Sequence, residues 1–251
     1  MRRKITAIVV AFLTSTIFVG CASYQELAFK SVEGKNHSAV TPAQRADQWW
    51  GPHHKAVNER LKQGNVDLLF IGDSITHSWE NAGKEIWDTY YAPRKAVNMG
   101  FGGDRTQHVL WRLDNSNLEG LSPKLAIVMI GTNNSNKNDN TAEEITDGII
   151  TVCQRLRTKL PKTKILLLAI FPRNAGPSAQ RQKNAKASRL ASRVADGKMI
   201  HYLDINSRFL TKNGLLTKDI MPDYLHPNKA GYKIWAEAIE SKVAELMGER
   251  K

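Results

Sequence analysis

An apolar run at residues 68–71 ends in Gly72-Asp73-Ser74, which would place a serine at the end of a buried strand. A serine hydroxyl attacks a carbonyl only when a neighbouring base removes its proton. The anionic oxygen formed in that attack must then be held by hydrogen-bond donors. Alone, Gly-Asp-Ser after a strand is more typical of an ordinary turn or helix cap. A base and a set of donors elsewhere in the chain are needed before Ser74 becomes a candidate nucleophile.

The best candidate base is a histidine near the C-terminus. Asp223 and His226 are three residues apart, and Pro227 after them favours an irregular loop. In a tight turn this spacing lets the carboxylate reach Nδ1 while Nε2 faces a hydroxyl. The same spacing also occurs at helix starts that carry a surface histidine. The local rival is His77, one helical turn after Ser74, which we expect at the rim of a site because a helix holds it beside the serine.

Candidate donors follow two further apolar runs. The most glycine-rich loop of the chain covers residues 98–106 and contains Gly103, and the run at 125–130 ends in Gly131-Thr132-Asn133. Because the carboxyl ends of parallel strands meet at one edge of a sheet, a hydroxyl, glycine N–H groups and a carboxamide would converge there.

The elements that must position these groups alternate along the chain. Strands are expected at 68–71, 95–98, 125–130, 165–171 and 199–203, with helical patterns between them and a first helical pattern from Pro42 to Gly64. The strands are continuous apolar runs, which is typical of a parallel sheet covered on both faces. The sequence predicts one α/β domain, a three-layer α/β/α sandwich with a mainly five-stranded parallel sheet.

Composition narrows the class of partner. The chain has 251 residues, 41% of them hydrophobic, and a formal net charge of +12. This charge suits solubility or attraction to anionic glycans and lipids. We expect no nucleic-acid partner, because no basic helix, zinc spacing or aromatic-rich strand motif is present. No cofactor is needed for the chemistry outlined, and no ligand cluster of suitable spacing predicts a metal.

The N-terminus indicates export. Arg2-Arg3-Lys4 precedes an apolar run at 5–19, as in a secretory signal. The run ends Phe18-Val19-Gly20-Cys21, which resembles a lipoprotein processing site with Cys21 as the lipidated residue. A plain secretory signal or a retained anchor are the alternatives. We expect a signal peptide over 1–20, a tether over 21–41 and a catalytic domain over 42–251, held in a bacterial cell envelope as an outer-membrane lipoprotein or, alternatively, soluble in the periplasm or secreted. The other cysteine, Cys153, lies in a helical pattern and reads as a core thiol.

Taken together, the motifs resemble a known family. Gly72-Asp73-Ser74, Gly103, Asn133 and Asp223-x-x-His226 match, in order, the four blocks of the SGNH (GDSL) hydrolases, whose fold is flavodoxin-like. A closer likeness is to the catalytic subunits of platelet-activating-factor acetylhydrolase, through residues 102–104, 108–113, 131–134 and 181–186. The α/β-hydrolases share the order Ser, Asp, His, but this chain lacks their G-x-S-x-G elbow.

The resemblance implies a role for each matched residue. Ser74 would be the nucleophile, His226 the general base and then acid, and Asp223 the residue that orients it. The oxyanion would be held by the backbone N–H groups of Ser74 and Gly103 and by the side chain of Asn133. The acyl pocket would be bordered by three residues whose bulk favours short acyl groups: Ile75, Thr132 and Leu225.

Three functions are compatible with these observations. The leading hypothesis is a serine esterase that removes short acyl groups, above all acetyl, from a carbohydrate or phospholipid-like substrate. The second is a lysophospholipase or thioesterase that acts on longer chains, and the third is a lipid-anchored binding protein without chemistry. The partners expected are a small-molecule or glycan ester and, through Cys21, a membrane. The sequence does not determine the oligomeric state. Related enzymes can form homodimers, but no exposed apolar stripe in this sequence predicts one.

Overall fold

A single parallel sheet forms the centre of the computed structural model, which describes residues 23–137 and 139–249. Its strand order is β2-β1-β3-β4-β5, and every neighbouring pair is parallel. The strands are β1 (Leu68–Gly72), β2 (Ala96–Gly100), β3 (Leu125–Met129), β4 (Lys164–Leu168) and β5 (Ile200–Leu203). The five predicted strands are confirmed, as is the three-layer α/β/α class.

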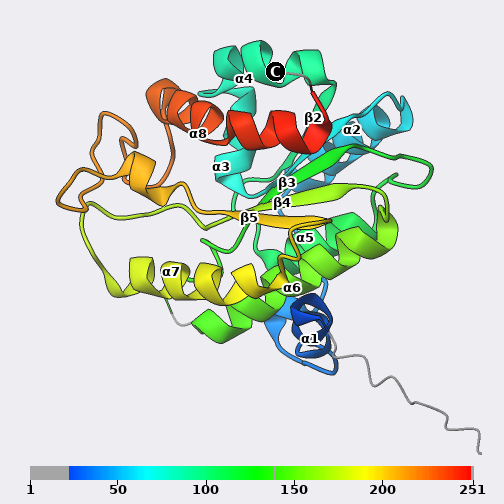
Figure 1. Ribbon diagram of the computed structural model, residues 1–251, viewed down its shortest axis with the longest axis horizontal. Coiled ribbons are helices and arrows are strands. Elements are labelled where there is room, and N and C mark those ends of the chain that lie inside the picture. The colour runs from blue at the N-terminus through cyan, green and yellow to red at the C-terminus, as the bar shows by residue number, and fades with distance from the viewer. Residues whose placement is uncertain (1–22, 138, 250–251) are drawn as a thin grey trace, which may run out of the picture.

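Helices cover both faces of this sheet (Figure 1). They are α1 (Tyr24–Lys30), α2 (Trp50–Lys62), α3 (Ser74–His77), α4 (Lys84–Tyr90), α5 (Thr106–Asp114), α6 (Ala142–Lys159), α7 (Ala179–Ala191) and α8 (Lys229–Met247). Short 3-10 turns are η1 (Ser38–Val40), η2 (Ser78–Glu80), η3 (Ala92–Arg94), η4 (Ser192–Val194) and η5 (Asn206–Phe209). Buried residues of α2, α5, α6 and α7 pack on one face, and those of α3, α4 and α8 pack on the other. No helix of the described residues is both long and apolar enough to cross a membrane.

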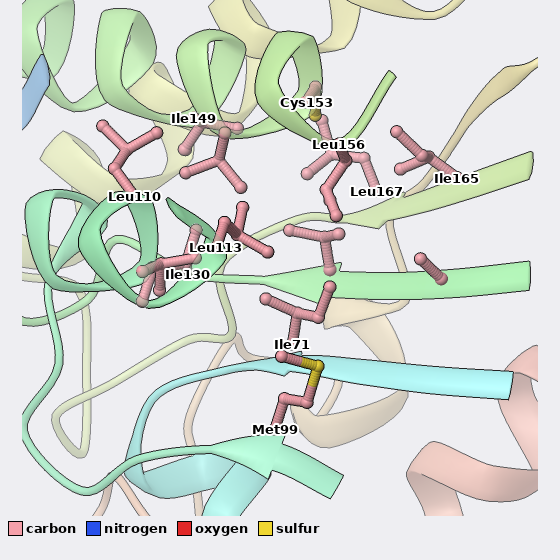
Figure 2. Packing of buried hydrophobic residues seen from close by; sticks show 14 of the residues in the cluster. Ile71, Met99, Leu110, Leu113, Ile130, Ile149, Cys153, Leu156, Ile165 and Leu167 are labelled. Carbon is pink, nitrogen blue, oxygen red and sulfur yellow. The ribbon is translucent and has the colours of Figure 1, made fainter. Parts of the chain in front are cut away.

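Alternate residues of each strand pack in the two core layers, because successive side chains of a strand point to opposite faces of the sheet. Figure 2 shows the layer in which Ile71 and Met99 lie on the same face as Leu167, under α5 and α6. Cys153 of α6 points into this layer, where its thiol is free and fully buried. Burial raises the pKa of this thiol to about 12, so the prediction of a core thiol is confirmed.

The sheet register brings three loops to one edge. Gly72 at the end of β1 is paired with Gly100 of β2 on one side and with Met129 of β3 on the other. The loops that follow carry Ser74, Gly103 and Asn133. The convergence predicted from the apolar runs is therefore a direct result of strands β2, β1 and β3 being neighbours that end level.

The N-terminal segment differs from the expected tether. From residue 23 onward it is folded onto the domain, because α1 buries Ala28 against α6 and η4 and the Ala39 carbonyl accepts a hydrogen bond from Thr106 Oγ1 (2.7 Å). His37 also contacts Asp147 of α6. The buried alanines of this segment, Ala28 and Ala39, form no helical or strand pattern in the sequence. The sequence therefore does not indicate that the segment packs on the domain. The predicted signal peptide and Cys21 lie outside the described residues.

The helix expected from Pro42 begins later. It starts at Trp50, and residues 42–49 form an irregular segment instead. This segment bonds to the start of α5, where Ala43 N–H donates to the Gln107 carbonyl. The difference places Arg45 beside the glycine-rich loop that follows β2.

Candidate active site

Ser74 lies at the first position of α3, directly after β1. The preceding residue, Asp73, caps this short helix by accepting a hydrogen bond from Ile75 N–H (3.0 Å). Because the first N–H groups of a helix have no intrahelical acceptor, the Ser74 N–H is available to a ligand. Ser74 itself is half-buried, so it stays partly accessible at the carboxyl end of the sheet.

The structure brings His226 to this hydroxyl across 152 residues of chain. His226 Nε2 lies 2.9 Å from Ser74 Oγ, and His226 Nδ1 lies 2.6 Å from Asp223 Oδ2. The other oxygen of Asp223 accepts from the N–H groups of Leu225 and His226. Burial alone would raise the pKa of Asp223, but these hydrogen bonds lower it overall, so the carboxylate stays ionised. The carboxylate therefore assigns the proton of the ring to Nδ1 and leaves Nε2 as an acceptor for the serine hydroxyl.

The glycine-rich loop forms a tight turn over residues 101–104. Asp104 N–H donates to the Phe101 carbonyl (3.1 Å), and Gly103 has φ +74. The Gly103 N–H has no acceptor within the part of the chain that the structure describes. Next to it, Asn133 Nδ2 donates to the Asp104 carbonyl (2.9 Å), which fixes the carboxamide against the turn. Gly103 and Asn133 thus lie together, as the sequence predicted.

A buried ion pair lies beneath this turn. Asp104 and Arg112 both have fully buried side chains, and Arg112 Nε donates to Asp104 Oδ2 (2.8 Å). Arg112 also donates to the carbonyls of Met99 and Gly72, at the ends of β2 and β1. Trp50 Nε1 donates to the second Asp104 oxygen (2.9 Å). Burial lowers the pKa of Arg112, with Asp104 opposing that shift. The pair joins two strand ends to the turn that carries Gly103.

The three residues expected around the acyl group differ in exposure. Ile75 and Thr132 are fully buried, whereas Leu225 is half-buried and packs on the same cluster as Ile75. Thr132 Oγ1 accepts from Arg173 (3.2 Å) and from Asn184 (3.4 Å). Burial and these bonds hold Thr132 in place.

Asp73 is the second titratable group next to the serine. Its side chain is fully buried, and Oδ2 has no hydrogen-bond partner within the described residues. Burial raises the pKa of Asp73 to about 7, while the bond from Ile75 N–H opposes the shift. Asp73 therefore organises the turn before Ser74. The free-energy cost of burying its carboxyl group depends on pH, because the ionised form is the one that burial disfavours.

His77 takes a position that the sequence did not predict in detail. Its Nδ1 accepts a hydrogen bond from Gly102 N–H (3.2 Å), so its proton resides on Nε2, which faces Glu80 at 3.7 Å. His53, His77 and Glu80 have ligand atoms within 4.8 Å of one another. A metal ion there would need a free lone pair on His77, but Nδ1 already accepts from Gly102 N–H and Nε2 then carries the proton. The cluster fits a loop support better than a metal centre.

A cavity of about 360 Å³ lies beside the outer strand β2, bounded by α2 and α4, and neither Ser74 nor His226 lines it. A second cavity, of about 320 Å³, is lined by Asp223, His226 and their neighbours Pro222 and Pro227. This second cavity borders the histidine that contacts Ser74, although Ser74 itself does not line it.

Several supporting residues were missed by the sequence reasoning. Asn134 is fully buried and connects the loop after β3 to α5, since its Oδ1 accepts from Thr106 N–H and its Nδ2 contacts Gln107 and Asn140. Arg112 could have indicated the buried ion pair from the sequence, because it is a charged residue beside Val109 and Leu113 on the apolar face of a predicted helix. A charge in such a position needs a buried partner.

Comparison with known proteins agrees with this geometry. A family model described as the GDSL-like lipase/acylhydrolase family matches residues 70–234, which include both Ser74 and His226. The chain belongs to this family. The chain is also similar to platelet-activating factor acetylhydrolase IB subunit alpha2 of Rattus norvegicus, with 36% identity over 224 residues. The alignment covers 86% of this chain and 95% of the relative. Like its GDSL relatives, the protein is a carboxylic ester hydrolase.

Solved GDSL structures confirm the fold. A GDSL-like lipase from Bacteroides thetaiotaomicron aligns with a TM-score of 0.60 at 20% identity, covering 79% of this chain and 97% of that one. An acetylxylan esterase from Geobacillus stearothermophilus aligns with a TM-score of 0.57 at 19% identity, covering 74% and 96%. At these identities the likeness concerns the α/β/α architecture of the GDSL fold.

Proposed function

We propose that the protein is a serine esterase that removes short acyl groups, above all acetyl, through an acyl-enzyme on Ser74. The observation that carries this proposal is the continuous contact from Ser74 Oγ through the His226 ring to the Asp223 carboxylate, at 2.9 and 2.6 Å. A hydroxyl, an imidazole with a free Nε2 and an ionised carboxylate in this order form the general-base relay of serine hydrolases.

The reaction follows from these contacts. His226 Nε2 takes the hydroxyl proton while Ser74 Oγ bonds to the ester carbonyl carbon. The resulting oxyanion is held by the N–H groups of Ser74 and Gly103 and by Asn133 Nδ2. The C–O bond to the alcohol then breaks as His226 returns the proton to the leaving oxygen. Water repeats the sequence on the acyl-enzyme, which releases the carboxylic acid and restores Ser74.

The preference for short acyl groups rests on the walls next to Ser74. Ile75 and Thr132 are fully buried, and Thr132 is held by Arg173, so walls formed by these residues would favour a small acyl group. A relative at 36% identity is named an acetylhydrolase, and a protein with the same fold is named an acetylxylan esterase. The competing function is hydrolysis of longer acyl chains by a lysophospholipase or thioesterase. Rates on p-nitrophenyl acetate, butyrate, octanoate and palmitate distinguish the two, because a small pocket loses activity steeply with chain length.

The leaving alcohol is proposed to be a carbohydrate or a phospholipid-like alcohol. The loop after β4 supplies Arg173 on that side, half-buried and bonded to the Thr132 carbonyl and to Asn136. An arginine there suits either a glycan hydroxyl or a phosphate. A screen of acetylated glycans against short-acyl phospholipids decides which alcohol is accepted.

The direct test of the esterase proposal uses p-nitrophenyl acetate. We expect the wild type to release p-nitrophenol and Ser74→Ala to lose this activity, with Ser78→Ala as a matched control four residues later. Equal rates for the wild type and Ser74→Ala would exclude Ser74 as the nucleophile. A binding protein without chemistry would show neither hydrolysis nor labelling of Ser74 by a fluorophosphonate.

The cellular location is a separate proposal, supported by the leader sequence alone. We propose export and lipid anchoring through Cys21. Cys21→Ser should move the full-length protein from the membrane fraction to the soluble fraction. Wild type in the soluble fraction would favour a plain secretory signal. The oligomeric state, which the sequence leaves open, is tested independently by sedimentation of the domain from residue 23.

A further inference from the structure

The turn that presents Gly103 has two glycines at its central positions. Phe101 and Asp104 are the outer residues, joined by the Asp104 N–H to Phe101 carbonyl bond (3.1 Å). Gly103 has φ +74 and Gly102 does not have positive φ, so the turn is of type II. In a type II turn the peptide between the two central residues has one orientation, and in a type I turn it is flipped by about half a revolution.

That central peptide is the one whose N–H belongs to Gly103. Its orientation therefore decides whether the donor faces Ser74 or turns away from it. Glycine adopts positive and negative φ with similar ease, so the sequence Gly102-Gly103 alone holds neither orientation firmly. An oxyanion donor has to be fixed before the reaction begins, because reorganising it would add to the barrier. Something outside the turn must select the type II form.

Arg45 contacts the central peptide from the opposite side. Its Nη1 donates to the Gly102 carbonyl at 2.5 Å, and a Cβ added to Gly103 would lie 2.8 Å from the same atom. The peptide is trans and planar, so a carbonyl that points at Arg45 directs the Gly103 N–H the other way. The guanidinium is itself held, since Nε donates to Asp47 (2.8 Å) and Nη1 lies 3.5 Å from Asp104 Oδ1.

His77 holds the preceding peptide of the same turn. The Gly102 N–H donates to His77 Nδ1, and the ring stacks against both His53 of α2 and Trp49, the residue before α2. This contact requires a neutral ring with its proton on Nε2. The charged and titratable groups that face the ring are His53 from α2, Glu80 from η2, and Asp104 and Arg112 from the loop and helix after β2. Burial lowers the pKa of His77 to about 4, which keeps the ring neutral at physiological pH.

We propose that Arg45 is a positioning residue of the ester hydrolase: it locks the Gly102-Gly103 peptide so that the Gly103 N–H faces the oxyanion, with His77 as the second support of the turn. The inference rests on the proposed role of Gly103 as an oxyanion donor. It assigns a function to the irregular segment 42–49, which lies far from Ser74 in sequence.

The test compares Arg45→Ala with Arg60→Ala on p-nitrophenyl acetate. Arg60 is a matched control, because it is also half-buried and donates to a glycine carbonyl, that of Gly64, but lies away from the turn. We expect Arg45→Ala to lower kcat about 10- to 100-fold with KM changed less than about twofold, since a misdirected donor weakens the transition state and not the bound ester. Arg60→Ala should retain the wild-type kcat.

Chemical rescue separates positioning from a general loss of structure. Guanidinium at millimolar concentration, far below denaturing levels, should restore part of the kcat of Arg45→Ala and leave Arg60→Ala and Ser74→Ala unchanged. Arg45→Lys, which keeps the charge and one donor, should retain more activity than Arg45→Ala. The proposal is overturned if Arg45→Ala keeps the wild-type kcat, or if its loss is not rescued by either route and follows a fall in Tm.

His77 provides the second readout. His77→Asn places an amide oxygen near the position of Nδ1 and should keep most of the kcat, whereas His77→Leu removes the acceptor and should lower it. Equal kcat for the two variants would remove His77 from the proposal. A wild type that fails to hydrolyse the ester would refute the proposed function, whereas a wild type active through Ser74 with a fully active Arg45→Ala would refute only the positioning role.

Discussion

The turn that carries Gly103 rests on a fully buried ion pair, whereas the loop that carries Asp223 and His226 lies in solvent. Asp104 and Arg112 have 0% exposed side chains, and those of Asp223 and His226 are 54% and 39% exposed. The first region is assembled from segments far apart in the sequence, and the second is assembled from four consecutive residues.

The contrast follows from what each region has to do. Hydrogen-bond donors stabilise a developing charge only if they are already in place, which requires a rigid frame such as the Asp104–Arg112 pair. A general base must accept and return a proton and admit water for the second half of the reaction. Local hydrogen bonds from Leu225 and His226 to Asp223 suffice to keep the base oriented while it stays accessible. We therefore expect damage to the exposed region to affect chemistry alone and damage to the buried region to affect folding as well.

The largest expected effect is on chemistry, in the exposed region. Asp223→Asn keeps an oxygen that can accept from the Leu225 and His226 N–H groups, but it replaces the acceptor of the His226 Nδ1 proton with an amide. We expect kcat to fall by roughly 10⁴-fold because the wrong tautomer faces Ser74. The urea midpoint should hardly move. Asp219→Asn, four residues earlier in the same loop, serves as the control, and a fall in stability that parallels the loss of activity would contradict the comparison.

The next effect is on stability, in the buried region. Arg112→Leu removes the buried cation that pairs with Asp104 Oδ2, leaving that carboxylate with Trp50 and the more distant Arg45, and it removes donors from the Gly72 and Met99 carbonyls. Breaking a buried pair from one side typically costs about 3 to 5 kcal/mol of unfolding free energy. Arg105→Leu breaks the exposed pair with Asp139 and should cost at most about 1 kcal/mol. Urea unfolding of the two variants measures both values, and similar losses would show that the turn does not depend on its buried frame.

A smaller effect is expected from Asp73, at the junction of the two regions. Its pKa is raised from an ordinary 3.8 to about 7 in the folded protein, so between these values the folded state holds a proton that the unfolded state has released. Stability contributed by this group therefore falls as pH rises through that window. From pH 5 to pH 7 the loss should be about 2 to 3 kcal/mol. Asp73→Asn should unfold with a weaker pH dependence than the wild type, and parallel curves would contradict the assigned pKa.

The sequence predicted the exposed region better than the buried one. The spacing of Asp223 and His226 and the apolar strand before Ser74 made these residues candidates, and the resemblance to the SGNH hydrolases assigned their roles. The level ends of β2, β1 and β3 then follow from parallel pairing. None of these inferences required knowledge of which distant residues touch.

The supports of the turn could not be found in this way. The partner of Arg112 is eight residues away across a turn and a helix start, and Arg45 lies 57 residues before the carbonyl it contacts. Segment 42–49 was predicted to be helical because its pattern continues into α2, and residues 21–41 were predicted to be a tether because they are polar and lack periodicity. Tertiary packing determines the conformation of both segments, and that packing cannot be predicted from their composition.

The central claim is that both regions act on a single nucleophile, Ser74. Peptide mass mapping after reaction with a fluorophosphonate tests it directly, since the reagent needs both an activated serine and an oxyanion site. We predict one adduct on the peptide that contains Ser74, with labelling much slower in both His226→Gln and Asn133→Ala. An adduct on another serine, or full esterase activity in a protein whose Ser74 is never labelled, would contradict the account.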